Sequence, residues 1–97
     1  MPTISLRNRR GDVIFSGDYN SREDMIIDAF RGVSSFTCVD FNNLDFPSLA
    51  AGTEIDHVSF TDCKFTNSRF PKFLFKNSEF ADCEFDRCYL AYCTFDI

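Results

Sequence analysis

Large apolar residues recur at every fifth position in the second half of the chain. The run is Phe60, Phe65, Phe70, Phe75, Phe80, Phe85, Leu90 and Phe95. An α-helix turns by about 100° per residue, so five-residue steps would spread these side chains around the whole helix. A β-strand alternates its faces, so every second side chain would point to the wrong side. Neither regular element buries this pattern, so a different backbone arrangement is required.

A second set of inward positions lies two residues before each large apolar residue. The large positions extend upstream to Phe36, Phe41, Phe46 and Ile55. The positions two residues earlier are mostly small and include Cys63, Cys83, Cys88 and Cys93. The bulkiest of them is Phe73. Each five-residue repeat therefore has one large inward site, one small inward site and three polar outward sites.

This pattern resembles the pentapeptide-repeat family, whose consensus is Ala-Asp/Asn-Leu/Phe-X-X. The resemblance covers residues 34–97 and implies a mainly β fold, a right-handed quadrilateral β-helix of about three coils. Each pentapeptide would form one side, with a corner every five residues. Coils would stack at about 4.8 Å, giving a rod about 15 Å long with Phe rings inside. In this arrangement Phe73 is expected to distort its side or to point outward.

The first third of the chain, residues 1–33, lacks the five-residue pattern. Alternating apolar positions over residues 3–16 predict a β-hairpin. Its turn would contain Arg9-Arg10-Gly11-Asp12, with Gly11 able to adopt a positive φ. Because the end of a solenoid exposes apolar side chains, we expect this segment to act as an N-terminal cap.

An amphipathic helix is predicted over residues 21–31. Ser21 is a favourable N-cap residue, and Gly32 suits the C′ position just beyond the helix. Together with the hairpin, this helix would close one end of the β-helix of residues 34–97. The whole chain is therefore expected to form a single structural domain.

One interruption breaks the five-residue spacing. The distance from Phe46 to the next large apolar residue is nine positions, which predicts a loop or short helical turn within residues 47–54. If this segment replaces two repeats, Phe41 shares a side with Phe60. Phe46 then shares the next side with Phe65.

The C-terminal end of the predicted β-helix has no capping element in the pattern. Its last apolar residues, Tyr92, Phe95 and Ile97, would lie near an open end. We expect this end to stack on a second copy of the chain in a twofold contact, giving a homodimer. A frayed tail that covers the end is the alternative.

The excess of negative charge lies in the repeats. The net charge is −5, and residues 34–97 carry ten acidic and five basic residues, whereas residues 1–33 are balanced. An acidic surface disfavours direct nucleic-acid binding but suits a basic protein partner. The acids expected along one edge are Asp40, Asp45, Asp62, Glu79, Asp82, Glu84 and Asp86. Their density over about 15 Å is comparable to that of duplex DNA, with one charge per about 1.7 Å.

The resemblance and the acidic edge together suggest a function. Some pentapeptide-repeat proteins resemble B-form DNA and inhibit DNA gyrase, and small phage proteins that block CRISPR nucleases often mimic DNA. We therefore expect a non-enzymatic phage inhibitor that blocks a bacterial DNA-binding protein. The target would be either a CRISPR effector, in which case the chain is an anti-CRISPR, or a type II topoisomerase. The alternative is a generic protein–protein interaction scaffold that binds around Phe73, Tyr89 and Tyr92, with the acids serving only solubility.

The remaining features of the sequence argue against an enzyme. Cysteines five residues apart on different sides would not converge as zinc ligands, so packed thiols are expected. The single histidine, His57, is expected to point outward without a catalytic partner. We expect no cofactor or metal. No apolar run reaches the roughly 20 residues of a membrane span, and no secretory signal is recognisable, so the bacterial cytosol is the expected location.

Overall fold

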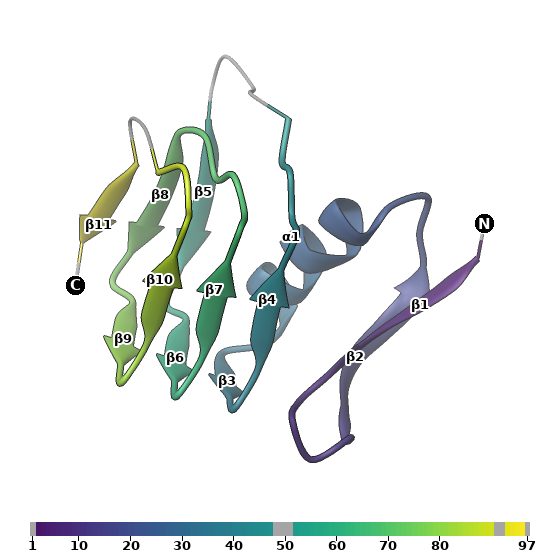
Figure 1. Ribbon diagram of the computed structural model, residues 1–97. Coiled ribbons are helices and arrows are strands. Elements are labelled where there is room, and N and C mark those ends of the chain that lie inside the picture. Colours follow the sequence, from purple (N-terminus) through teal and green to yellow (C-terminus); the bar gives the residue numbers. More distant parts are fainter. Residues whose placement is uncertain (1, 48–51, 91–92, 97) are drawn as a thin grey trace.

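The structure is a computed structural model that describes residues 2–47, 52–90 and 93–96. Within these ranges the chain forms an antiparallel hairpin, one α-helix and three small parallel sheets (Figure 1). The predicted class, mainly β with one short helix, is confirmed. None of the helical structure described is long and apolar enough to cross a membrane.

The predicted N-terminal hairpin is present. Strand β1 (Thr3–Arg7) pairs antiparallel with strand β2 (Val13–Asp18). In the turn between them, Gly11 has a φ of 88°, which glycine adopts without a Cβ clash. The side chain of Asn8 closes this turn by accepting a hydrogen bond from the N–H of Asp12 at 3.0 Å. The turn residues thus fix the pairing of the two strands.

Helix α1 (Arg22–Gly32) begins where the sequence predicts it. The hydroxyl of Ser21 accepts a hydrogen bond from the N–H of Asp24 at 3.2 Å and so satisfies one free donor of the first turn. The predicted end is wrong by one residue. Gly32 is the last helical residue, and Val33, with an extended backbone, is the C-cap.

One face of helix α1 closes the end of an aromatic core. Its buried residues are Met25, Ile26, Ala29 and Phe30. The Phe30 ring meets the rings of Phe36, Phe41 and Phe60 edge to face, with centroids 5.5, 5.4 and 5.3 Å away. This geometry places the positive ring edge against the negative ring face. Helix α1 consequently lies between the hairpin and the parallel sheets (Figure 1).

Each parallel sheet takes one strand from three successive passes of the chain, which we define as residues 35–58, 59–78 and 79–96. The first sheet contains β3 (Ser35–Thr37), β6 (Ser59–Thr61) and β9 (Glu79–Ala81). The second contains β4 (Asp40–Asn42), β7 (Lys64–Thr66) and β10 (Glu84–Asp86). The third contains β5 (Thr53–Asp56), β8 (Phe73–Lys76) and β11 (Thr94–Asp96). A fourth side has only isolated bridges, which join Asp45, Arg69 and Tyr89.

A left-handed backbone conformation, which recurs every five residues from His57 to Arg87 and also occurs at Cys38 and Asn43, explains the period in the sequence. Non-glycine residues with φ between 50° and 57° are Cys38, Asn43, His57, Asp62, Asn67, Lys72, Asn77, Asp82 and Arg87. Each one bends the chain out of the extended conformation. The small inward residue follows it directly, and the large inward residue follows three positions later. One bend per pentapeptide therefore returns every fifth side chain to the interior.

The large inward rings stack between passes. Face-to-face pairs with interplanar angles of 14° or less are Phe36–Phe60, Phe41–Phe65, Phe60–Phe80, Phe65–Phe85 and Phe75–Phe95. Their centroids are 4.6 to 5.4 Å apart, close to the strand spacing of about 4.8 Å. The predicted stacking of Phe rings inside the repeat region is confirmed.

The nine-residue interruption in the spacing takes the place of one five-residue repeat, not of two. Strands β3 and β6 pair with an offset of 24 residues, whereas β6 and β9 pair with an offset of 20. Phe41 is consequently in register with Phe65. The expectation that Phe41 shares a side with Phe60 is wrong, and Phe46 belongs to the fourth side. The predicted loop or helical turn falls mainly on residues 48–51, outside the described residues.

Phe73 points into the core, although it occupies a position that otherwise holds small residues. Two outcomes were expected, a distorted side or an outward ring, and the outward ring is wrong because only 1% of the Phe73 surface is exposed. Strand β8 keeps its parallel register, with Phe73 paired to the smaller Thr53. The ring fits because it packs edge-on against Phe46 and Phe70, with centroids 4.9 and 5.3 Å away.

Candidate functional site

The seven acids of the predicted edge do not form one continuous row. Asp40 and Glu84 project from the β4–β7–β10 sheet with Lys64 in register between them. Asp45 lies on the fourth side, in a bridge with Arg69. The corrected register causes this separation, because it moves both first-pass acids one side further around the structure.

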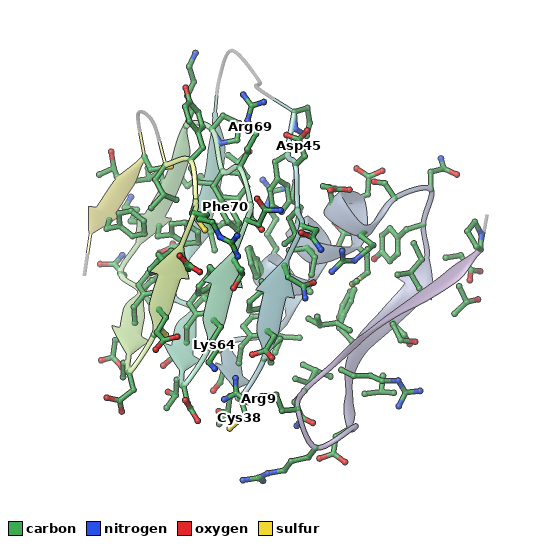
Figure 2. All side chains as sticks on the ribbon, in the orientation of Figure 1. Arg9, Cys38, Asp45, Lys64, Arg69 and Phe70 are labelled. Atoms are coloured by element: carbon green, nitrogen blue, oxygen red, sulfur yellow. The ribbon has the colours of Figure 1, made fainter. Side chains whose placement is uncertain are left out.

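Arg9, from the hairpin turn, holds two of the predicted acids. Its Nη1 forms an ion pair with Oδ1 of Asp40, and its Nη2 lies 3.0 Å from Oδ2 of Asp62. Nη2 also donates a hydrogen bond to the Asp62 carbonyl oxygen at 2.7 Å. The backbone N–H of Arg9 donates to the carbonyl of Cys38 at 2.8 Å, and the two residues lie together in Figure 2. The hydrogen bond to the Asp40 carboxylate raises the pKa of Arg9 above its ordinary value.

Sequence reasoning missed the role of Arg9. The two acids that it contacts lie 31 and 53 positions away along the chain. Because residues 1–33 carry equal numbers of acidic and basic residues, their net charge gave no indication that one of their arginines neutralises acids of the repeats. Only the position of the hairpin turn beside the first two passes brings these groups together.

Asp45 is also engaged within the molecule. Its Oδ1 lies 3.9 Å from Nε of Arg69. Its backbone N–H donates a hydrogen bond to the Glu23 carboxylate in helix α1 at 2.9 Å. The three acids nearest the N-terminal cap, Asp40, Asp45 and Asp62, thus all face a cation of the same chain.

The third pass carries the remaining four acids, which we call the third-pass acids: Glu79, Asp82, Glu84 and Asp86. All four are exposed; three lie in strands β9 and β10, which are outermost in their sheets, and Asp82 is the corner residue between these strands. Asp86 lies 3.6 Å from Nε of Arg87. Within residues 2–47, 52–90 and 93–96, the other three have no cation within 4.0 Å. The uncompensated negative charge of the predicted edge is therefore concentrated at one end of the structure.

The third pass also exposes part of the aromatic core. Phe85 and Phe95 are 39% and 37% exposed, whereas their stacking partners Phe65 and Phe75 are buried. Of the predicted self-association residues, Phe95 is therefore accessible. Tyr92 and Ile97 lie outside the described residues.

The surface that the scaffold alternative requires is only partly available. Phe73 is buried and cannot contact a partner without rearrangement of the core. Tyr89 is 46% exposed on the fourth side, and Arg69 lies over its ring at 5.1 Å. Tyr92 lies outside the described residues.

The thiols in the small inward positions pack as expected. Cys63 is fully buried and donates its S–H to the carbonyl of Phe36 at 3.4 Å, and Cys88 donates to the carbonyl of Phe65 at 3.1 Å. Burial raises the pKa of Cys63 to about 11, so it is a neutral thiol near pH 7. His57 points outward as predicted, with 73% of its side chain exposed. In the described parts of the chain, no three His, Cys, Asp or Glu side chains cluster as metal ligands would.

Comparisons with protein-family models, with curated proteins and with solved structures found no match to this chain. The proposals below therefore rest on the residues and geometry described above.

Proposed function

We propose that the three parallel sheets and the bridged fourth side are the walls of a right-handed quadrilateral β-helix of the pentapeptide-repeat type. The 20-residue offset between the second and third passes, the stacked rings and the recurring left-handed residues support this proposal. The hairpin and helix α1 are its N-terminal cap, because Phe30 covers the first-pass rings. Capped solenoids commonly present one side or end to partners.

We further propose that the chain is a non-enzymatic inhibitor whose third-pass acids take the place of DNA phosphates on a DNA-binding protein. One contrast carries this proposal. The acids near the cap are neutralised by Arg9 and Arg69, whereas Glu79, Asp82 and Glu84 are exposed without a cation nearby among the described residues. Exposed like charges repel one another, and a basic partner relieves that repulsion.

The contact made by Arg9 indicates how such a partner would be held. Its guanidinium meets two carboxylates and one backbone carbonyl at the corner of the repeats. Asp62 and Asp82 are equivalent corner residues of successive passes, separated by about one strand spacing of 4.8 Å. One DNA strand carries a charge per about 3.4 Å of axis, so the acids offer basic side chains a spacing of similar scale.

The expected partner is a bacterial DNA-binding protein in the cytosol of the host cell. A CRISPR effector and a type II topoisomerase are the two candidates, because both expose basic channels that hold DNA. Because there are only three short passes, the inhibitor would cover only a short part of a partner's DNA-binding site. This favours a partner with a compact DNA-binding site, such as a CRISPR effector. The inhibitor would then compete with DNA and would not contact nucleic acid itself.

The test is inhibition of each candidate by the purified protein. We would measure DNA cleavage by a CRISPR nuclease and supercoiling by DNA gyrase, with wild-type protein and with the double variant Asp82→Asn, Glu84→Gln. Asparagine tolerates the left-handed backbone at position 82, so this variant removes charge without backbone strain. The matched control is Glu54→Gln, Asp56→Asn, which removes the same charge from exposed positions on β5.

Inhibition that the third-pass variant loses and the β5 variant keeps would support DNA mimicry. It should also weaken as salt concentration rises, because exposed charge pairs are screened. Equal inhibition by both variants would reject the third-pass acids as the site. No inhibition of either enzyme, together with no competition against DNA for other basic proteins, would reject the proposed function.

A generic interaction scaffold is the alternative function. In that case the third-pass acids protect the outermost strands β9 and β10 from pairing with other chains, as charged residues often do at sheet edges. The Asp82→Asn, Glu84→Gln variant would then retain its partner but aggregate more readily. Light scattering of concentrated protein would detect this aggregation, so that it can be distinguished from a specific loss of inhibition.

We also propose that the third pass mediates self-association. The exposed rings of Phe85 and Phe95 and the free edges of the outermost strands favour a stacked pair of chains. The third-pass acids would oppose this contact, so the dimer should strengthen with salt. Analytical ultracentrifugation at low and high salt tests this dependence, and a monomer under both conditions would reject the contact.

A further inference from the structure

Strand β10 is the outermost strand of its sheet, and three regular columns of groups end on it: backbone hydrogen bonds, charges and aromatic rings. Within the described residues β10 pairs only with β7, so one edge of its backbone has no neighbouring strand. Such an edge offers unpaired N–H and C=O groups to an extended segment of another molecule. The three columns together indicate which segment fits this edge.

The backbone of β10 directs its open hydrogen-bonding groups away from β7 at Phe85. The N–H of Glu84 donates to the carbonyl of Cys63 at 3.1 Å, and the carbonyl of Asp86 accepts from the N–H of Asn67 at 2.8 Å. Successive residues of a strand direct these groups to opposite sides. The N–H and C=O of Phe85 therefore face the open edge.

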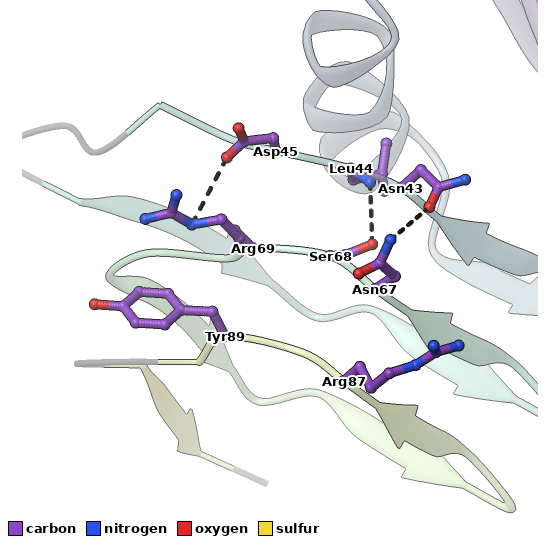
Figure 3. A pocket seen from close by; sticks show the side chains of 8 residues that line it. All are labelled: Asn43, Leu44, Asp45, Asn67, Ser68, Arg69, Arg87 and Tyr89. Atoms are coloured by element: carbon purple, nitrogen blue, oxygen red, sulfur yellow. Dashed lines mark hydrogen bonds and ion pairs between the residues drawn. The ribbon is translucent and has the colours of Figure 1, made fainter.

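The corner residues that follow the three strands of this sheet supply a second open donor. The N–H of Asn43 donates to the carbonyl of Thr66 at 3.1 Å, and Asn67 makes the equivalent bond one pass later. Arg87 is the third corner residue of this series (Figure 3), and its N–H has no such acceptor among the described residues. The three corner residues line a groove on the fourth side together with Asp45, Arg69 and Tyr89.

The carbonyls that precede the three strands supply a second open acceptor. The carbonyl of Val39 accepts from the N–H of Lys64 at 3.0 Å, and that of Cys63 accepts from the next pass. The carbonyl of Cys83, the next in this series, has no such donor in the described ranges. The open edge of β10 thus has the same pattern of donors and acceptors that β7 offers to β10, and a parallel strand fits it.

The second column is one of alternating charge. Asp40, Lys64 and Glu84 are paired in register on the three strands. Opposite charges on directly paired residues favour strand pairing, whereas like charges oppose it. Because Glu84 is exposed at the end of this column, the residue that fits opposite it is a lysine or an arginine.

The third column is a stack of aromatic rings. The centroids of Phe41 and Phe65 are 5.0 Å apart at an interplanar angle of 14°, and those of Phe65 and Phe85 are 4.6 Å apart at 5°. Phe85 is 39% exposed, so its ring can still bury apolar surface against another ring. In a parallel strand this fourth ring belongs to the residue directly after the basic one.

We propose that the open edge of β10 binds, as a parallel strand, an extended segment of a partner protein in which a basic residue directly precedes an aromatic residue. The basic side chain pairs with Glu84, and the aromatic ring stacks on Phe85. The segment donates hydrogen bonds to the carbonyls of Cys83 and Phe85 and accepts them from the N–H groups of Phe85 and Arg87. This inference rests on the proposed attraction of the third-pass acids for a basic partner, and it specifies the part of the partner that is bound.

A second copy of the chain fits this edge less well than a basic segment. A twofold contact centred on Phe85 would run two β10 strands antiparallel and set Glu84 of each chain opposite Asp86 of the other. Like charges directly opposite each other destabilise strand pairing. A segment with a basic residue on each side of its aromatic residue gains from both acids instead.

The test is an NMR titration of the whole, isotopically labelled chain with the peptide acetyl-Ala-Lys-Phe-Lys-amide. We expect saturable shifts of the Phe85 and Arg87 amide signals and nuclear Overhauser contacts between the peptide ring and the Phe85 ring. Acetyl-Ala-Glu-Phe-Glu-amide, which keeps the ring and reverses the charges, should not bind. Glu84→Gln should weaken binding about threefold, whereas the matched variant Glu54→Gln, on strand β5, should leave it unchanged.

Methyl groups on single peptide nitrogens test the strand pairing itself. In the parallel arrangement the backbone nitrogen of the first lysine donates to the Cys83 carbonyl, whereas that of the phenylalanine points away from β10. Methylation of the lysine nitrogen should therefore weaken binding about tenfold, and methylation of the phenylalanine nitrogen should be tolerated. Equal binding of the two methylated peptides would overturn the proposal, because charge attraction alone would then explain the binding. The reverse preference would overturn the parallel arrangement.

Two further results would overturn the proposal. One is the absence of saturable shifts at Phe85 and Arg87. The other is a dimer, seen by sedimentation, that excess peptide does not dissociate, which would assign the edge to a second copy.

The inhibition assays separate this inference from the proposed function. Inhibition of the nuclease or of gyrase without peptide binding would overturn the inference and leave the proposed function standing. Peptide binding without inhibition of either enzyme would support the inference and count against DNA mimicry.

Discussion

The ring of Phe73 packs edge-on against the ring of Phe46, with centroids 4.9 Å apart and an interplanar angle of 63°. Phe73 belongs to the second pass and occupies an inward position that otherwise holds small residues. Phe46 belongs to the first pass and occupies one of the large inward positions. Phe73 also meets Phe70 at 90°, so two edge contacts fix its orientation. A side chain that breaks the repeat pattern is thereby part of the core.

Replacing Phe73 with the small residue that the repeat favours should destabilise the protein. Phe73→Ala leaves a cavity between Phe46 and Phe70 and should lower the free energy of unfolding by about 3–5 kcal/mol. Urea denaturation followed by circular dichroism measures this loss. The control Phe85→Ala truncates a ring that is 39% exposed and should cost clearly less. An equal or smaller loss for Phe73→Ala would contradict the packing described.

The left-handed backbone at Lys72 should limit stability. Its φ is 56°, a region in which lysine is strained but asparagine is tolerated. Lys72→Asn should raise the free energy of unfolding by about 0.5–1 kcal/mol, measured by thermal or urea denaturation. Lys76→Asn makes the same charge change in strand β8 and should give no gain. A similar gain from both variants would point to charge as the cause instead of backbone strain.

The Arg9 contacts should hold the hairpin against the first two passes. Arg9→Gln removes both ion pairs and should increase amide hydrogen exchange in strands β1 and β2 roughly tenfold relative to helix α1. Arg10→Gln, in the same turn, is the control and should leave exchange unchanged. Unaltered exchange in Arg9→Gln would show that the backbone hydrogen bond to Cys38 holds the turn by itself.

The buried thiol of Cys63 should make stability depend on pH in alkaline solution. Its pKa is about 11 in the folded protein, against about 8.5 for an exposed cysteine. Between these values the unfolded chain releases a proton that the folded chain retains. Stability contributed by this group is therefore complete below about pH 8.5 and falls as pH rises toward 11.

Comparison with Cys63→Ala isolates this effect from the other titrating groups. The variant should lose about 1 kcal/mol at neutral pH through the missing buried sulfur. The difference in unfolding free energy between wild type and variant should shrink as the pH rises above about 8.5. A constant difference up to pH 11 would mean that Cys63 ionises equally in both states.

Local patterns in the sequence predicted much of the architecture. The five-residue period predicted which side chains are inward, because a periodic backbone must repeat its inward positions. Capping chemistry at Ser21 and the glycine-containing turn at Gly11 predicted the start of the helix and the hairpin turn. These signals depend on neighbouring residues, and a sequence reports such neighbours directly.

The candidate sites depended on contacts that the sequence does not encode locally. The offset of 24 residues between β3 and β6 moved Asp40 and Asp45 away from their predicted sides. A spacing of nine residues fits either one or two repeats, and only the strand pairing distinguishes them.

By itself, the sequence determined the period, the inward residues and the excess of acid in the repeats. The tertiary structure decided which charges remain available to a partner. Arg9 reaches Asp62 from 53 positions away and neutralises the cap end, so the uncompensated acids of the predicted edge lie on the third pass. It also decided that Arg69, Arg87 and Tyr89 share one groove. Net charge is a sum over residues, whereas a binding surface depends on distances, and these follow only from the folded chain.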